Sequence, residues 1–497
     1  MKIKQFLCVL LAALMIVPLA ACGEDTQTPA DDTTAAADTT TAESTTEAPP
    51  PPEYEPAGVK YDGQTVTFTG YSYSGNWAIL RYNVALMEET GDIINDAIVK
   101  RNRKVEEELG VKMSMVKLTS NDRAKTTVLE KYIQAQDDVL NFAMQMNCGL
   151  SKILTTKGLV LNLKSISTLD LDKSWWNQSA NEEYTINGTQ YAAVGDMCLL
   201  NLGAPVVVYF AKDLIKNNKL ADPYQLVYDG KWTIDKMYEM AEAADRDVDG
   251  NGAPDKTDIF GFATEMASLS YGLYGAGVRY STRDKDGNLS LTLYNEKAVT
   301  YTEKMVALIR DKDTTLYYED WKKGYSNAHS DFFMPKLMAN ELLFYSNQLL
   351  VTLNLREMES DFGIVPMPKA DEKQENYISI ANTYFSDHVV VPATCGRLEQ
   401  TGHLLDAMGY YAQQYITPAF IDQSIKLKGV RDEDSLNMIN LIHATQTFDV
   451  GQIFDWGGMS TILTDMVIKN ETNFASRWDG IKTKAETALK TTLDSLK

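Results

Sequence analysis

The chain has 497 residues, of which 44% are hydrophobic and 10% aromatic. This is enough for two or three domains with large buried cores. Its 47 Lys and Arg stand against 68 Asp and Glu, a formal net charge of −21. That balance disfavours nucleic acid and anionic lipid as partners, because both would be repelled. Five cysteines in so long a chain exclude a small disulfide-stapled domain.

The first residues combine a short positive region with an apolar run. Lys2 and Lys4 precede the apolar stretch 6–19, which ends in Leu19-Ala20-Ala21-Cys22. The stretch is short for a membrane span. It resembles a bacterial lipoprotein signal, which implies cleavage of residues 1–21, acyl chains such as palmitate on Cys22, and a place on the extracellular face of the cell membrane. An N-terminal helix of the fold and an ordinary secretory signal are the alternatives.

Residues 22–56 are composed mainly of Thr, Ala, Pro and acidic residues. From Gly23 to Pro56 there are nine Asp or Glu and no Lys or Arg. Such a segment buries too little apolar area to offset the entropy of ordering, so we expect a disordered tether. Three further cysteines, Cys148, Cys198 and Cys395, are expected to be buried free thiols.

The body beyond the tether alternates between strand and helix patterns. A strand is predicted over 64–69, a helix from Ile94 to Leu109 that Gly110 ends, and a second strand from Val111 to Met115. A helix over 124–136 and a strand over 138–146 follow. This β-α-β-α-β order predicts an α/β fold with a mostly parallel sheet. Later predictions are strands within 199–210 and 389–391, a helix from the N-cap Thr233 to Ala244, and a final amphipathic helix over 481–496.

Several segments in order carry a family resemblance. They are Asn95-Asp96-Ala97-Ile98 with Arg101-Asn102-Arg103, Gly158 to Leu163, Leu171 to Gln178 with Trp175-Trp176, Trp232-Thr233 with 247–262, and Asp361 to Pro368. Together with Cys22 they resemble the family 1 extracellular solute-binding proteins, which are maltose-binding-protein-like. The similarity runs over about residues 60–497 and is diffuse, because no single motif is diagnostic.

This resemblance implies a two-lobed, periplasmic-binding-protein-like fold of type II, with a ligand cleft between lobes joined by crossing strands. The first lobe would comprise 57–200 and about 375–447, and the second about 201–374 and 448–497. Such proteins capture a solute, most often a sugar or oligosaccharide, and deliver it to the permease of an ABC importer. The chain is then expected to be a monomer without enzymatic activity, in contact with the membrane only through its lipid.

The acidic loop at 247–258 has the oxygen-ligand spacing of a calcium loop. With Asp247 as position 1, Asp249 and Asn251 fall at 3 and 5, and Gly252 at 6 allows the sharp turn. The Ala253 carbonyl, Asp255 and Asp258 complete the predicted ligand set. One structural Ca²⁺ is the expected cofactor, without an organic one, and a solvated turn is the alternative.

A sugar site needs aromatic faces for its C–H groups, and amides or carboxylates for its hydroxyls. Such side chains should lie at strand ends that face the other lobe. The predicted ligand-binding residues are Tyr71, Trp77, Asn147, Trp176, Tyr271, Tyr274, Asn347 and Trp456. Any single aromatic residue is more often part of the core.

Two other functions share the tether and the aromatic residues. A lipid-anchored glycosidase would need paired carboxylates, which 68 acidic residues supply by chance. No nucleophile elbow, dinucleotide fingerprint or P-loop is present, and the four histidines have no metal-ligand spacing. A surface protein that captures polysaccharide without a transporter is the remaining alternative.

Overall fold

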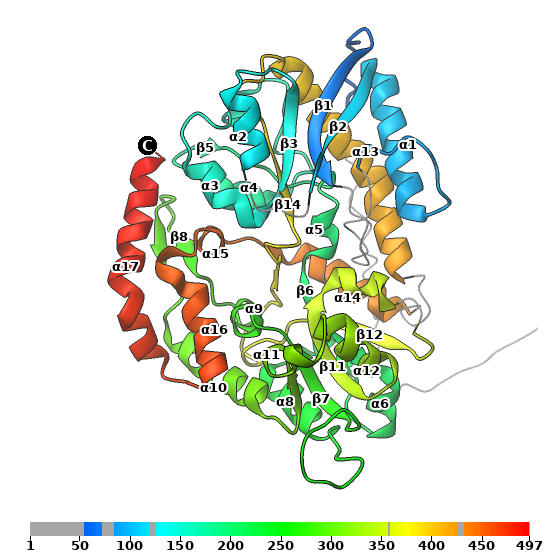
Figure 1. The fold of residues 1–497 in the computed structure, drawn as a ribbon, viewed down its shortest axis with the longest axis vertical. Coiled ribbons are helices and arrows are strands. Elements are labelled where there is room, and N and C mark those ends of the chain that lie inside the picture. The colour runs from blue at the N-terminus through cyan, green and yellow to red at the C-terminus, as the bar shows by residue number, and fades with distance from the viewer. Residues whose placement is uncertain (1–53, 72–83, 120–125, 356–357, 426–431, 497) are drawn as a thin grey trace, which may run out of the picture. The chain divides into compact units, whose positions relative to one another are not determined.

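The computed structural model describes residues 54–71, 84–119, 126–355, 358–425 and 432–496. The predicted signal peptide, Cys22 and the tether up to residue 53 lie outside them. Two separate sheets organise the described residues, as Figure 1 shows. Each is flanked by helices, which confirms the predicted α/β class. No helix in these ranges combines the length and apolarity needed to cross a membrane.

The first sheet has four strands in the order β14-β3-β1-β2. They are β1 (Gln64–Tyr71), β2 (Val111–Leu118), β3 (Leu140–Met146) and β14 (Asp387–Val390). β1 is parallel to β2 and β3, and β14 is antiparallel to β3. The predicted mostly parallel sheet is therefore confirmed. Between β1 and β2 runs α1 (Ile93–Leu109), which Asp92 caps and Gly110 ends at a φ of 62°.

The second sheet has five strands in the order β10-β7-β11-β6-β12. They are β6 (Val206–Ala211), β7 (Phe260–Thr264), β10 (Thr315–Tyr317), β11 (Leu342–Gln348) and β12 (Phe362–Pro366). β7 is parallel to both β10 and β11, whereas β6 is antiparallel to β11 and β12. All five strands are buried along their length.

The helices divide between the two sheets. α13 (Leu398–Ile425) runs along α1, and α14 (Glu433–Ala444) packs against β12 of the second sheet, although it falls in the stretch predicted for the first lobe. The lobe boundaries themselves stay a prediction. The remaining α-helices are α2 (Thr127–Gln134), α3 (Leu150–Thr155), α4 (Gln178–Tyr184), α5 (Leu200–Gly203), α6 (Lys212–Asn217), α7 (Pro223–Tyr228), α8 (Ile234–Glu242), α9 (Ser268–Gly275), α10 (Glu296–Arg310), α11 (Tyr318–Trp321), α12 (Met334–Met338), α15 (Val450–Phe454), α16 (Met459–Lys469) and α17 (Phe474–Ser495).

The short strands form two-stranded pairs. They are β4 (Thr185–Ile186) with β5 (Thr189–Gln190), β8 (Ser281–Arg283) with β9 (Leu289–Leu291), and β13 (Ser379–Ile380) with β15 (Gln446–Thr447). Part of one sequence prediction is wrong. Residues 200–203 form α5, and only 206–211 of the predicted strand run is extended. A fully buried apolar run lacks the alternation that separates strand from helix.

Three segments that connect the sheets lie side by side. Pro205, just before β6, forms an antiparallel bridge with Ala381, and Asn382 N–H donates to the Ala204 carbonyl at 3.0 Å. β13 pairs in parallel with β15. The chain therefore changes sheets through paired crossing segments, and we define this set as 204–205, 379–382 and 445–447.

Glu183 of α4 forms a second connection, to elements around the second sheet. Its Oε1 accepts from Arg279 at 2.6 Å, and its backbone carbonyl accepts from Arg283 at 2.7 Å. Its Oε2 accepts from the Val450 backbone at 3.3 Å. The Glu183 side chain is 8% exposed. Burial raises its pKa to about 6, although Arg279 pulls it down.

The raised pKa of Glu183 predicts a pH effect on stability. A carboxyl with a higher pKa in the folded state stabilises the fold below its unfolded pKa, and that stability is lost as pH rises through the folded pKa. As pH rises from 4.5 to about 6, the wild type loses about 2 kcal/mol of unfolding free energy through this carboxyl group. The difference in unfolding free energy between Glu183→Gln and wild type should shift in favour of the variant over that interval. Urea unfolding at several pH values measures it, and a difference independent of pH would contradict the assignment.

Trp456 is a packing residue in this structure. It is 2% exposed, stacks on Phe454 with ring centroids 5.1 Å apart, and its Nε1 donates to Thr492 Oγ1 of α17 at 2.9 Å. Trp456→Ala should therefore lower the unfolding free energy by about 3–5 kcal/mol, because it opens a cavity under α17. Thr492→Val removes only the hydrogen bond and should cost about 1 kcal/mol. Equal stability of Trp456→Ala and wild type in denaturant melts would refute this packing role.

Candidate functional site

Strand ends from both sheets carry polar residues. In open α/β sheets ligands bind beyond the carboxyl ends of parallel strands. β3 ends at Met146, which pairs with Asp387, the first residue of the antiparallel strand β14. In the second sheet, the parallel strands β7 and β10 end in register at Thr264 and Tyr317.

The segment 382–386 lies between the first sheet and the crossing segments. The backbone N–H groups of Asn147 and Cys148 donate to the carbonyls of Ser386 and Thr383 at 2.9 and 3.0 Å. The Tyr384 side chain projects from this segment and is 58% exposed, the highest value among the exposed large hydrophobic residues described. Such an exposed ring is a stacking surface for a ligand.

Glu265 directly follows β7 and lies near several tyrosines. It is half-buried, and its Oε1 is shielded from solvent without a hydrogen-bond partner in the described ranges. Burial raises its pKa to about 7, and a hydrogen bond with Tyr271 opposes that rise. The pKa of Tyr271 is raised mainly by burial, then by Glu265, and further by the phenols of Tyr280 and Tyr384. The Glu265 carboxyl and the Tyr384 phenol therefore both lie near Tyr271.

Further polar atoms near Glu265 also lack partners. Thr264 Oγ1, Ser268 Oγ and Tyr317 OH are shielded from solvent and make no hydrogen bond to any described residue. Buried polar groups are normally paired with protein, water or ligand. We call the set Thr264, Glu265, Ser268, Tyr271, Tyr317 and Tyr384 the strand-end site. The set combines an exposed aromatic ring, hydroxyl groups and a carboxyl whose pKa is raised by burial.

Of the predicted ligand-binding residues, Tyr271 belongs to this site and three others are held by protein partners. Asn147 donates to Tyr184 OH at 2.9 Å, and its Oδ1 lies 2.9 Å from Nδ1 of His388. Tyr274 OH donates to Asp449 at 2.9 Å. Asn347 donates to Tyr345 OH and accepts from the Gln348 backbone. All are buried, so ligand contact by them stays a prediction.

Two of the predicted ligand-binding tryptophans, Trp176 and Trp456, lie in packing positions. Trp176 is 2% exposed and its Nε1 donates to Asp406 at 3.0 Å; Trp456 packs under α17. Contact of either with a ligand stays a prediction. Trp77 lies outside the described residues, as does the side chain of Tyr71, the last residue of β1.

Sequence reasoning missed Glu265 and Tyr384. A signal existed for Glu265, because an acidic residue directly after the buried strand Phe260–Thr264 marks a strand end. No periodic signal identifies Tyr384, since it lies in an irregular segment whose position depends on the crossing segments.

The acidic loop brings three of its predicted ligands together. Carboxylate oxygens of Asp247, Asp249 and Asp258 lie within 4.8 Å of one another. Asp247 accepts from the backbone of Gly250 at 2.7 Å and of Gly252 at 2.8 Å, and Gly252 has a φ of 74°. The loop is thus folded around its first aspartate, as the predicted spacing requires. Asn251 and Asp255 hydrogen-bond to each other at 2.9 Å.

Comparison with known proteins bears on the fold. No family model and no curated protein matches the sequence. Among solved structures, an ABC substrate-binding protein from Listeria monocytogenes in complex with cycloalternan has 13% identity and a TM-score of 0.53, covering 88% of this chain and 98% of that one.

Two further structures have the same arrangement. A cyclic alpha-maltosyl-1,6-maltose binding protein from Arthrobacter globiformis has 12% identity and a TM-score of 0.55, over 87% of this chain and 99% of that one. UgpB from Mycobacterium tuberculosis in complex with glycerophosphocholine has 14% identity and a TM-score of 0.54, over 80% and 95%. With its two sheets and paired crossing segments, this chain has the two-lobed, periplasmic-binding-protein-like α/β fold of these solved structures.

Proposed function

We propose that the chain is an extracellular solute-binding protein that captures a sugar or oligosaccharide and delivers it to an ABC importer. The observation that carries the proposal is the strand-end site, where Tyr271 lies near both the exposed ring of Tyr384 and the carboxyl of Glu265, one oxygen of which is unpaired among the described residues. An aromatic face beside unpaired polar atoms is the combination that a sugar requires.

The fold and the compartment signals support the same function. Two of the similar structures are named for cyclic glucans or bound to one, whereas the third holds glycerophosphocholine. The lipoprotein-like segment ending in Cys22 supports anchoring at the extracellular face of the cell membrane. Import requires permease subunits as partners, and a monomer suffices for binding. The proposal includes no catalytic step, so the bound solute leaves unaltered.

A ligand screen tests the sugar class. Purified protein is heated with a panel of mono- and oligosaccharides that includes maltotetraose, and in parallel with glycerophosphocholine and oligopeptides. We expect stabilisation by at least one sugar, because a ligand that binds only the folded state raises the unfolding free energy. Stabilisation by glycerophosphocholine or peptide alone would overturn the sugar assignment. Chemical conversion of a stabilising sugar would overturn the binding function in favour of a glycosidase.

Substitution of Tyr384 then tests the site. Tyr384→Ala should weaken the affinity for the stabilising sugar about tenfold, because a stacking face is lost. The melting temperature should change little, since the ring is 58% exposed. Tyr228, at 48% exposure on α7, provides the matched control Tyr228→Ala. Isothermal titration measures both, and equal affinity of Tyr384→Ala and wild type would show that the sugar binds elsewhere.

We also propose that the acidic loop holds one Ca²⁺ as a structural clip. Three convergent carboxylates repel one another unless a cation neutralises them. The nearby ammonium group of Lys336 donates to the Asp258 backbone carbonyl at 2.7 Å and to Glu341, so it does not neutralise Asp247 or Asp249 directly. The short Asp258 at position 12 would contribute fewer contacts than the Glu usual there.

Calcium should therefore raise the thermal stability of the protein. At a hundredfold excess over Kd the gain is about 2.7 kcal/mol of unfolding free energy, and chelator should remove it. Asp247→Asn should abolish the response to calcium. Asp284→Asn, which alters another Asp-rich turn, is the matched control and should keep it. Identical melting curves with calcium and with chelator would refute the clip.

A further inference from the structure

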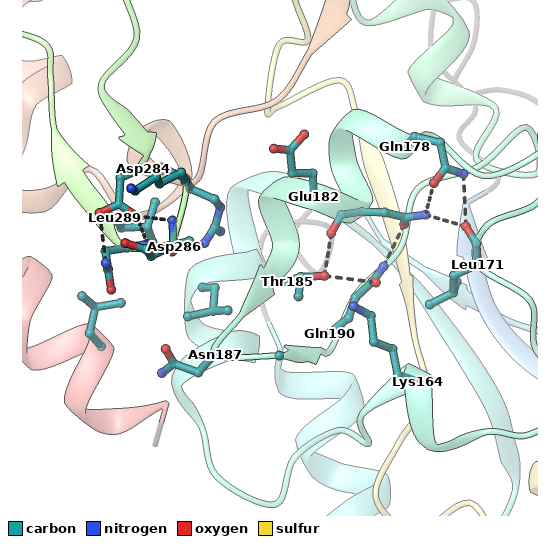
Figure 2. A pocket seen from close by; sticks show the side chains of 18 of the residues that line it. Lys164, Leu171, Gln178, Glu182, Thr185, Asn187, Gln190, Asp284, Asp286 and Leu289 are labelled. Carbon is teal, nitrogen blue, oxygen red and sulfur yellow. Dashed lines mark hydrogen bonds between the residues drawn. The ribbon is translucent and has the colours of Figure 1, made fainter.

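A groove outside the strand-end site runs along the β8–β9 hairpin. Its first part is a cavity of about 650 Å³, shown in Figure 2. One wall of this cavity is formed by α4 and the β4–β5 hairpin, and the other by the β8–β9 hairpin. Its second part is a cavity of about 660 Å³ between β9 and α17. Leu289 and Leu493 line both parts, so the two cavities adjoin.

Helix α4 separates this groove from the strand-end region. Tyr184 faces inward, where its OH accepts from Asn147 next to β3. Asn181, Glu182 and Thr185 line the groove instead. The residues that line the groove are therefore different from those of the strand-end site.

The wall formed by α4 and the β4–β5 hairpin is a hydrogen-bonded row of amides. Gln190 donates to Asn181 at 2.7 Å and accepts from Thr185 at 3.3 Å, and Asn181 donates to the Leu171 carbonyl at 2.8 Å. These bonds fix the wall before any ligand arrives, which reduces the entropy cost of binding.

Polar groups that remain available lie within the groove. Figure 2 shows the side chains of Glu182 and Asn187 between the amide wall and the Asp284–Asp286 turn. Neither has a hydrogen bond to a described residue. Arg283 also lines the cavity, and its Nε is shielded from solvent without a partner in those ranges. These groups offer both acceptors and donors for hydroxyls.

The second part of the groove supplies aromatic surface. Tyr294 is 39% exposed and stacks on Trp478, with ring centroids 6.0 Å apart and planes at 11°. Phe474 meets the Tyr294 ring edge-on at 5.6 Å. The pair of rings at Tyr294 and Trp478 is therefore held in place by packing, and the exposed part of Tyr294 is a preformed platform.

The charges of the groove nearly cancel. Five cationic and six anionic side chains line its two parts together. A phosphate, a nucleic acid or a bare cation would meet as much repulsion as attraction there. From the aromatic platform, the available polar groups and this balance, we propose that the groove is a second binding site, for a neutral glycan chain.

Affinity electrophoresis in gels that contain a soluble neutral polysaccharide tests the site. The gels hold, in turn, a starch-type glucan, a mixed-linkage β-glucan, a galactomannan and an arabinoxylan. We expect at least one to retard the protein. Tyr294→Ala should weaken that binding about tenfold, because it removes the aromatic platform. Glu182→Ala should weaken it several-fold, because it removes a hydrogen-bond acceptor for hydroxyl groups. Tyr228→Ala should leave it unchanged.

The strand-end variant Tyr384→Ala separates this proposal from the proposed function. Retardation should survive Tyr384→Ala, and binding of the small sugar by titration should survive Tyr294→Ala. Absence of retardation in all four gels would overturn the second site, as would retardation that Tyr294→Ala leaves intact. Loss of retardation in Tyr384→Ala would show that one site binds both ligands. Circular dichroism of each variant confirms that it is folded.

Discussion

The backbone pairing of the crossing segments is the constraint on which the rest depends. Residues 204–205, 379–382 and 445–447 are joined by main-chain hydrogen bonds, and Gln446 and His443 add side-chain bonds to the carbonyls of Asn201 and Leu202. Because the chain leaves the first sheet just before β6 and returns to it just before β14 through these paired segments, their backbone bonds help to set how the strand ends of the two sheets face each other. A change in the angle between the two sheets would bend these segments.

Buried polar groups make the second connection specific. Asp449 accepts from Tyr274 OH, from the hydroxyl of Ser281 and from the backbone of Tyr280 and Gly451, all between 2.7 and 2.9 Å. Arg279 lies between Asp449, at 3.9 Å, and Glu183. With so many donors the Asp449 carboxylate is stable without solvent. Removal of one partner of such a cluster leaves a buried charge, which is far costlier than the intact pair is favourable.

The sequence predicted the elements of the body better than the site. Strands such as β1 and β3, the helix that Gly110 ends and the cap at Thr233 follow from periodicity and local chemistry, and the structure confirms them. The fate of each aromatic residue depends on long-range packing instead. Trp456, predicted as a ligand-binding residue, is buried and hydrogen-bonded to α17, which comes later in the chain. Tyr384 is exposed because the crossing segments place its irregular segment there, which no local pattern encodes.

The two sites meet at one short helix, and that limits how they can influence each other. Arg283 lines the groove and donates to the Glu183 carbonyl, and the next residue, Tyr184, accepts from Asn147 near β3. A continuous set of contacts is not by itself coupling. A glycan in the groove changes the affinity of the strand-end site only if it prefers one arrangement of α4 against the β8–β9 hairpin. Glu183 contacts Arg279 just before β8 and Arg283 at its end, so a coupling between the two proposed sites would have to shift these contacts, and it would be equal in both directions.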